Sequence, residues 1–197
     1  AQTYDFSHDK LRQQAYASLS PAHQHLLHRR VAEALEEVYA GDLDAVSGQI
    51  AVHYERAGLP DSAIPYYQRA GEVACRLYAN TEALHAFERA AALLEAHTSR
   101  QARQEVPWET AARVYESLGD VSLEMGGYQE ARQAYENAMA YVPLQEHIWQ
   151  ACLQRKVANT WNHGSNNPHD TCHLNARHAF QEAERILTHA ATPSSPA

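Results

Sequence analysis

Apolar residues recur at helical spacing along nearly the whole chain. In one clear example, Leu27, Val31 and Leu35 fall on a single face, with Ser20 as a candidate N-cap and Pro21 at the first helical position. Valine, isoleucine and threonine are sparse, so strands are not expected to contribute much. The pattern predicts eight or nine helices, over approximately 8–19, 20–39, 42–58, 60–79, 81–97, 108–125, 128–142, 144–162 and 173–190.

The strongest internal pattern lies in the second half of the chain. It combines a helix carrying an aromatic residue, a leucine and a glycine with a second helix and a closing proline: Tyr115, Leu118, Gly119, Ala131, Tyr135, Ala138 and Pro143. This spacing resembles the tetratricopeptide repeat, apart from Ser122, which stands where a second aromatic is usual. In that repeat the small residues lie where two antiparallel helices cross closely. Because one unit cannot bury its apolar face alone, the pattern predicts a stack of units.

Weaker copies of the second-helix pattern flank this repeat. Ala63 and Tyr67 match it, and so do Ala83 and Phe87 twenty residues later. That separation is too short for two full repeats, so we expect these two helices to share a third helix as their partner. A last copy carries both a first-helix and a second-helix match: Val157, Ala158 and Trp161, then Ala176, Phe180 and Ala183.

These patterns predict an all-α fold. We expect a tetratricopeptide-like α-solenoid of antiparallel helix pairs, wound into a right-handed superhelix. Residues 1–19 would contain the first helix, residues 20–100 tetratricopeptide-like repeats, and residues 107–191 two further repeats. The last repeat would carry an inserted turn at 162–172, and residues 192–197, which lack an apolar anchor, would form a disordered tail.

Charge and composition exclude several classes of protein. The formal net charge is -8 and the sequence pI is about 5.9, which argues against a protein that reads a phosphate backbone. Three widely separated cysteines do not indicate a disulfide framework. No apolar run approaches the roughly 20 residues that a membrane-spanning helix needs. We therefore expect a cytoplasmic protein without nucleic-acid or membrane partners, and a chain that is a piece of a longer polypeptide.

Few motifs point to chemistry. The sequence has no phosphate-binding glycine loop, no G-x-S-x-G motif and no C-x-x-C pair, so we expect neither enzymatic activity nor a cofactor. Near the inserted turn, His169, Cys172 and His173 offer imidazole and thiolate groups that could bind zinc. Their spacing is irregular, so a solvated loop is the alternative to a metal site or a small zinc enzyme.

Aromatic residues are the candidates for a binding groove. Partners of a solenoid commonly dock on its concave face. Trp108 and Trp149 stand outside the repeat signature and, together with Tyr66, are the groove candidates. The alternative is that these rings only pack between helices.

The first half of the chain resembles a known class of regulator. The stretches "FSHDKLRQQAYASL", "LHRRVAEALE", "IAVHYERAG" and "AGEVACRLYANTEALHAFERAAALL" are similar to the region that follows the nucleotide-binding core in bacterial STAND signal-transduction ATPases. That class includes the LuxR-type large ATP-binding regulators. The resemblance implies that residues 1–19 are the end of a preceding winged-helix-like segment, and that an ATPase domain of the same polypeptide lies upstream.

The same resemblance suggests a role for the start of the chain. His8 and Asp9 look like the counterpart of a histidine-containing motif whose imidazole approaches the β-phosphate of bound ADP in that class. His8 would sense nucleotide only when the ATPase core is present. The alternative is that Ser7 or Asp9 caps the first helix.

Two functions remain in view at this stage. One is a non-catalytic interaction scaffold that forms the sensor or regulatory arm of a larger bacterial signal-transduction ATPase or transcriptional regulator. The other is a free-standing tetratricopeptide adaptor that binds a peptide or a partner protein. Both place a protein or peptide partner on the concave face.

Overall fold

The chain is helical throughout the part that the structure describes. The computed structural model describes residues 9–96, 106–163 and 172–191, and within these ranges it contains helices and no strands. The elements are α1 (Asp9–Ala17), α2 (Pro21–Val38), the short 3-10 helix η1 (Leu43–Val46), α3 (Ser47–Arg56), α4 (Pro60–Arg76), α5 (Asn80–Ala96), α6 (Trp108–Glu124), α7 (Tyr128–Tyr141), α8 (His147–His163) and α9 (Cys172–Ala191). The prediction of an all-α fold is confirmed.

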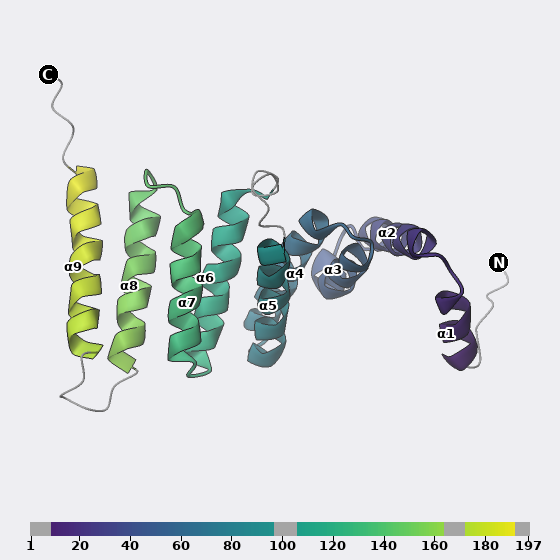
Figure 1. The fold of residues 1–197 in the computed structure, drawn as a ribbon, viewed down its shortest axis with the longest axis horizontal. Helices are drawn as coiled ribbons and strands as arrows, with labels where there is room; N and C mark the ends of the chain where they lie inside the picture. Colours follow the sequence, from purple (N-terminus) through teal and green to yellow (C-terminus); the bar gives the residue numbers. More distant parts are fainter. Residues whose placement is uncertain (1–8, 97–105, 164–171, 192–197) are drawn as a thin grey trace, which may run out of the picture.

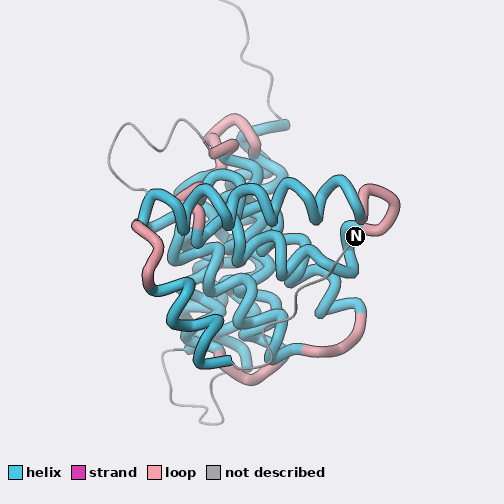
Figure 2. Tube along the Cα trace, turned by 90° about the vertical axis from the view of Figure 1, so that its right-hand side faces the viewer, coloured by secondary structure: helices cyan, strands magenta, loops and turns pink. Residues whose placement is uncertain are grey.

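The helices form an extended row. Each helix from α2 to α8 packs against the one that follows it in the chain. Figure 1 shows this row, with α1 set apart at the N-terminal end. Seen along the long axis, the helices run in changing directions, so the row twists as it advances (Figure 2). Because contacts between successive helices along a twisting row define an α-solenoid, the predicted tetratricopeptide-like solenoid is confirmed.

Local sequence signals set several helix ends. Ser20 caps α2, because its Oγ accepts a hydrogen bond from the backbone N–H of His23 at 3.4 Å. Pro21 and Pro60 begin α2 and α4, where a missing N–H costs little. The turn between α3 and α4 contains Gly58 at a φ of 71°, a backbone conformation that glycine adopts without strain.

Two glycines allow paired helices to cross closely. Gly119 of α6 lies against the ring of Tyr135 of α7, and a Cβ atom on Gly119 would overlap that ring. Gly71 of α4 faces Phe87 of α5 in the same way, and its Cβ would come within 2.6 Å of the ring. Both rings are fully buried. The two helix pairs α4–α5 and α6–α7 are therefore built on the same glycine–aromatic contact.

This contact corrects one expectation. The helices with the repeated second-helix pattern, α4 and α5, pack mainly on each other instead of on a shared third helix, and α6, which packs on α5, touches α4 only slightly. Helix α4 also packs on α3, so it acts as the second helix of one pair and the first helix of the next. The signal for the second role is Gly71, which stands 16 residues before Phe87, as Gly119 stands before Tyr135.

The C-terminal pair α8–α9 uses small and branched residues at its crossing. Four of these residues are buried there: Val157, Ala158, Ala176 and Ala183. Phe180, in contrast, keeps 38% of its surface exposed. The inserted turn falls mostly on residues 164–171, and these and the predicted tail 192–197 lie outside the described residues.

The glycine contacts lead to a direct test of the fold. We expect Gly71→Ala and Gly119→Ala each to lower the free energy of unfolding by about 1–3 kcal/mol, because a buried ring would have to move. Gly48→Ala is the matched control. Gly48 is also helical, but its Cβ would meet the Ala70 Cβ at an ordinary 3.8 Å, so helix propensity should stabilise that variant by up to about 1 kcal/mol. Urea denaturation followed by circular dichroism measures all three, and equal effects would contradict the packing argument.

Candidate interaction surface

Two of the three predicted groove residues lie together. Trp108 at the start of α6 and Trp149 in α8 pack with their ring centroids 5.4 Å apart and their planes tilted by 53°. Both side chains are half-buried. Tyr66 lies elsewhere, on α4, where it stacks on Tyr54 of α3 at 5.9 Å. The structure thus brings the tryptophans into one cluster and leaves Tyr66 out of it.

A polar network continues from the tryptophans along α6 and α8. The indole N–H of Trp149 donates to Glu116 Oε2 at 2.8 Å. The Lys156 ammonium donates to Glu116 Oε1 at 2.8 Å and to both carboxylate oxygens of Asp120 at 2.7 Å. The Tyr135 hydroxyl donates to Asp120 Oδ1 at 2.8 Å. The bonds of Trp149 and Lys156 connect α8 directly to α6, and the bond of Tyr135 connects the intervening helix α7 to α6.

The network fixes the charge on Lys156. Burial lowers the pKa of its ammonium, but the hydrogen bonds and charges of Asp120 and Glu116 outweigh burial, so the pKa is raised. Its contribution to stability is therefore fully present below the ordinary lysine pKa of 10.5 and is lost at higher pH. Burial and Asp120 also raise the pKa of Tyr135, which stays a neutral donor.

Two arginines, one on α6 and one on α7, lie over tryptophan rings of α8. The Arg113 guanidinium lies 5.4 Å from the centre of the Trp149 ring. Arg132 of α7 lies 3.1 Å from the centre of the Trp161 ring, and its Nε donates to Thr160 Oγ1 at 3.1 Å. Such contacts orient both partners, because the ring face carries partial negative charge.

A pocket of about 440 Å³ lies between α4 and α6. It is lined by Glu72, Cys75, Arg76, Phe87, Ser117, Asp120, Val121 and Glu124. Arg76 forms an ion pair with Asp44, so its charge is balanced. Burial raises the pKa of the Cys75 thiol, and the nearby carboxylates of Glu124, Asp120 and Glu72 raise it further. The pocket is therefore an electrically negative depression with an apolar wall.

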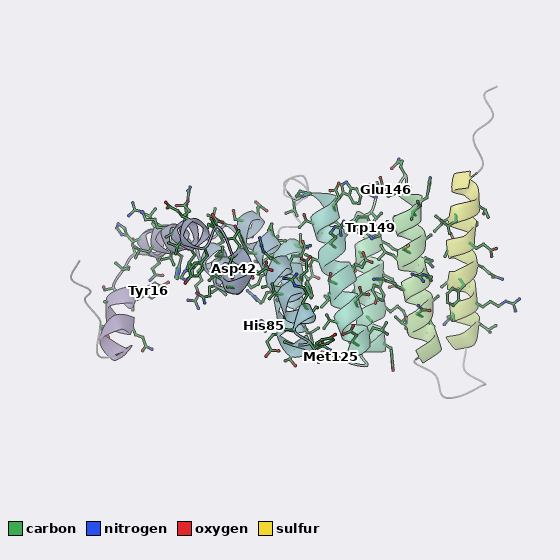
Figure 3. All side chains as sticks on the ribbon, turned by 180° about the vertical axis from the view of Figure 1, so that it is seen from behind. Tyr16, Asp42, His85, Met125, Glu146 and Trp149 are labelled. Carbon is green, nitrogen blue, oxygen red and sulfur yellow. The ribbon has the colours of Figure 1, made fainter. Side chains whose placement is uncertain are left out.

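We call the surface formed by α4, α6 and α8 the inner face. It contains the tryptophan pair, the Lys156 network and the acidic pocket. Figure 3 shows Trp149 at the same end of the stacked helices as Glu146, opposite the end marked by Met125. The acidic residues were missed in the sequence, although Glu116, Asp120 and Glu124 follow each other at four-residue steps and so lie on one side of α6.

The remaining candidate residues are not placed by the structure. His8 and His169 lie outside the described residues. Asp9 begins α1 and Cys172 and His173 begin α9, but the surroundings of these three side chains are not described. Elsewhere in the described ranges, no group of three His, Cys, Asp or Glu residues could hold a metal ion. The nucleotide-sensing and zinc hypotheses therefore stay predictions.

The fold and this surface define a tetratricopeptide-like helical solenoid. The chain is similar to two crystal structures of MamA, each at 18% sequence identity and a TM-score of 0.50. The first match covers 96% of this chain and 99% of MamA, and the second covers 95% and 93%. No family model matches the sequence, and no curated protein matches it. None of the helices in the described ranges has both the length and the apolar composition to cross a membrane.

The Lys156 network can be tested by stability measurements. We expect Lys156→Met to lower the free energy of unfolding by about 1–3 kcal/mol, because two half-buried carboxylates lose their partner. Adding Glu116→Gln should cost less than the sum of the two single changes, since the residues act as one unit. Arg29→Met is the control. Arg29 and Glu33 form an exposed pair within α2, for which little or no loss of stability is expected. Additive effects at Lys156 and Glu116 would rule out the coupled network.

Proposed function

We propose that the chain is a non-catalytic interaction scaffold that binds a protein or peptide partner on its concave face, formed by α4, α6 and α8. The observation that carries this proposal is the combination of half-buried tryptophans and an acidic pocket on one continuous surface. Tryptophan supplies large contact areas at binding sites, and solenoids present their concave side to partners.

The charges on this surface favour a partner with basic residues. Within the described ranges, the ion pairs do not include Glu72 or Glu124, whereas Lys156 is already bound to Glu116 and Asp120. A carboxylate on the partner would therefore meet repulsion without a free lysine to receive it. A lysine or arginine entering the pocket would be attracted by Glu72 and Glu124.

Two settings for this scaffold are proposed. In the first, the chain is the sensor arm of a larger bacterial ATPase regulator, and its partner shifts the arm relative to an upstream ATPase domain. In the second, the chain is a free-standing adaptor. The ATPase setting rests on the sequence resemblance alone, and a cytoplasmic location without nucleic-acid or membrane partners is proposed for both. Reading the coding sequence upstream of residue 1 distinguishes them, because only the first requires a phosphate-binding loop there.

Site-specific photo-crosslinking in the source cells tests the binding surface. A photoreactive amino acid at Arg113 or Glu124 would lie on the inner face, whereas one at the exposed position Glu136 of α7 serves as the control. We expect one partner to be captured from both inner-face positions and not from Glu136. With that partner purified, exchanging Glu72 and Glu124 for glutamine should weaken binding by at least about tenfold, roughly 1.4 kcal/mol.

Two other outcomes would contradict parts of this proposal. Capture from Glu136 alone would place the partner on another surface. Full-strength binding by the double glutamine variant would remove the requirement for a basic partner while leaving the scaffold itself in place.

A further inference from the structure

The junction between α1, α2 and α3 contains an unusual pair of histidines. His28 of α2 has only 8% of its surface exposed. The other residues classed as buried and polar in the described ranges are serines and a threonine, so His28 is the one among them that titrates. Its Nδ1 lies 2.8 Å from Nδ1 of His53 in α3. Its Nε2 lies 2.9 Å from the hydroxyl of Tyr16 in α1. One buried imidazole thus connects three helices.

The Nδ1–Nδ1 contact restricts how many protons the pair can hold. A hydrogen bond between two imidazole nitrogens needs one N–H donor and one bare nitrogen as acceptor. The neutral pair satisfies this condition, and so does the pair with one added proton. When both rings are protonated, both nitrogens carry hydrogen and the contact becomes a repulsion between two cations.

The surroundings oppose protonation further. The charged or titratable groups that act on the pair in the described ranges are His25 from α2, Arg56 from α3 and the Tyr16 hydroxyl from α1. Burial lowers the pKa of His28, and His53, Arg56 and His25 lower it further. Burial and Arg56 also lower the pKa of His53. Each of the charged neighbours is basic, so none of them stabilises an added positive charge.

Helix α1 depends strongly on this junction. It stands apart from the stacked helices (Figure 1), and Tyr16 lies at its end nearer to α2 (Figure 3). The side-chain bonds described between α1 and α2 are the Tyr16–His28 contact and the donation from Gln24 Nε2 to the Tyr16 carbonyl at 3.1 Å. A helix of nine residues is not stable by itself in water, so α1 should unfold when it is released.

We propose that His28 and His53, with Tyr16, form a proton-operated latch that holds α1 on the solenoid at neutral pH and releases it when both imidazoles are protonated. Release lets His28 reach water and take up a proton. Because the released state binds more protons, docking of α1 weakens progressively as the pH falls below the ordinary histidine pKa of 6.5 and is unaffected by pH above that value.

The test uses the whole chain and compares α1 with the rest of the solenoid. Hydrogen exchange read by mass spectrometry, corrected for the intrinsic effect of pH, follows peptides within residues 13–19 and, as an internal reference, peptides of α4 and α5. Between pH 7.5 and pH 5.0 the protection of the α1 peptides should fall at least about fivefold, the equivalent of about one hydrogen bond. The reference peptides should change less than twofold.

Variants separate the latch from general acid sensitivity. Tyr16→Phe should lower α1 protection about fivefold at pH 7.5, because the link to His28 is gone, and should change it little at pH 5.0, where the latch is already released. The pair His28→Gln with His53→Gln should remove the pH dependence. His85→Gln, at an exposed histidine of α5, should keep the wild-type profile. Unchanged α1 protection in the wild type at pH 5.0, or wild-type pH dependence in the double variant, would overturn the latch.

A spectroscopic measurement covers the case in which the double variant does not fold. In wild-type protein with labelled imidazole nitrogens, NMR should detect a coupling across the His28–His53 hydrogen bond at pH 7.5 that disappears at pH 5.0. Persistence of that coupling at pH 5.0 would overturn the proposal.

Discussion

The close crossing of paired helices at a glycine is the contact on which this solenoid depends. At Gly71 and at Gly119 the absence of a side chain lets a whole aromatic ring lie against the backbone of the partner helix. The ring then fills the space that would otherwise separate the two helices, and both rings are fully buried. Because each pair must cover the next, the distance set at these crossings determines how the whole row stacks.

The inner face is connected to the same contact. Tyr135 fills the crossing with its ring, and its hydroxyl reaches Asp120, which in turn binds Lys156 of α8. A side chain of the core thus positions the carboxylate that joins two neighbouring repeats. The arrangement of charges on the proposed binding surface is therefore set by core packing and not by surface residues alone.

The sequence predicted the parts of the structure that follow from local spacing. Helical periodicity located the helices, and the Gly119–Tyr135 signature identified the repeat class. The pattern also drew attention to Trp108 and Trp149, but their contact joins residues 41 positions apart and depends on how α6 and α8 stack. The same holds for His28 and His53, whose pairing across α2 and α3 has no local signature. Gly71 was readable in the sequence, but a first-helix match there was hidden by the second-helix match at Ala63 and Tyr67 in the same helix.

The bridge from Lys156 to Glu116 and Asp120 has a mechanical consequence. Most contacts in the row join consecutive helices, as is usual in a solenoid, so the row can bend at the contacts between neighbouring helices. The ion pairs of Lys156 skip α7 and join α6 directly to α8. Bending that moves α6 and α8 apart on this side must break these ion pairs, whereas bending that brings the two helices closer need not. The C-terminal half of the row should therefore resist bending that separates α6 from α8 more strongly than bending that brings them together.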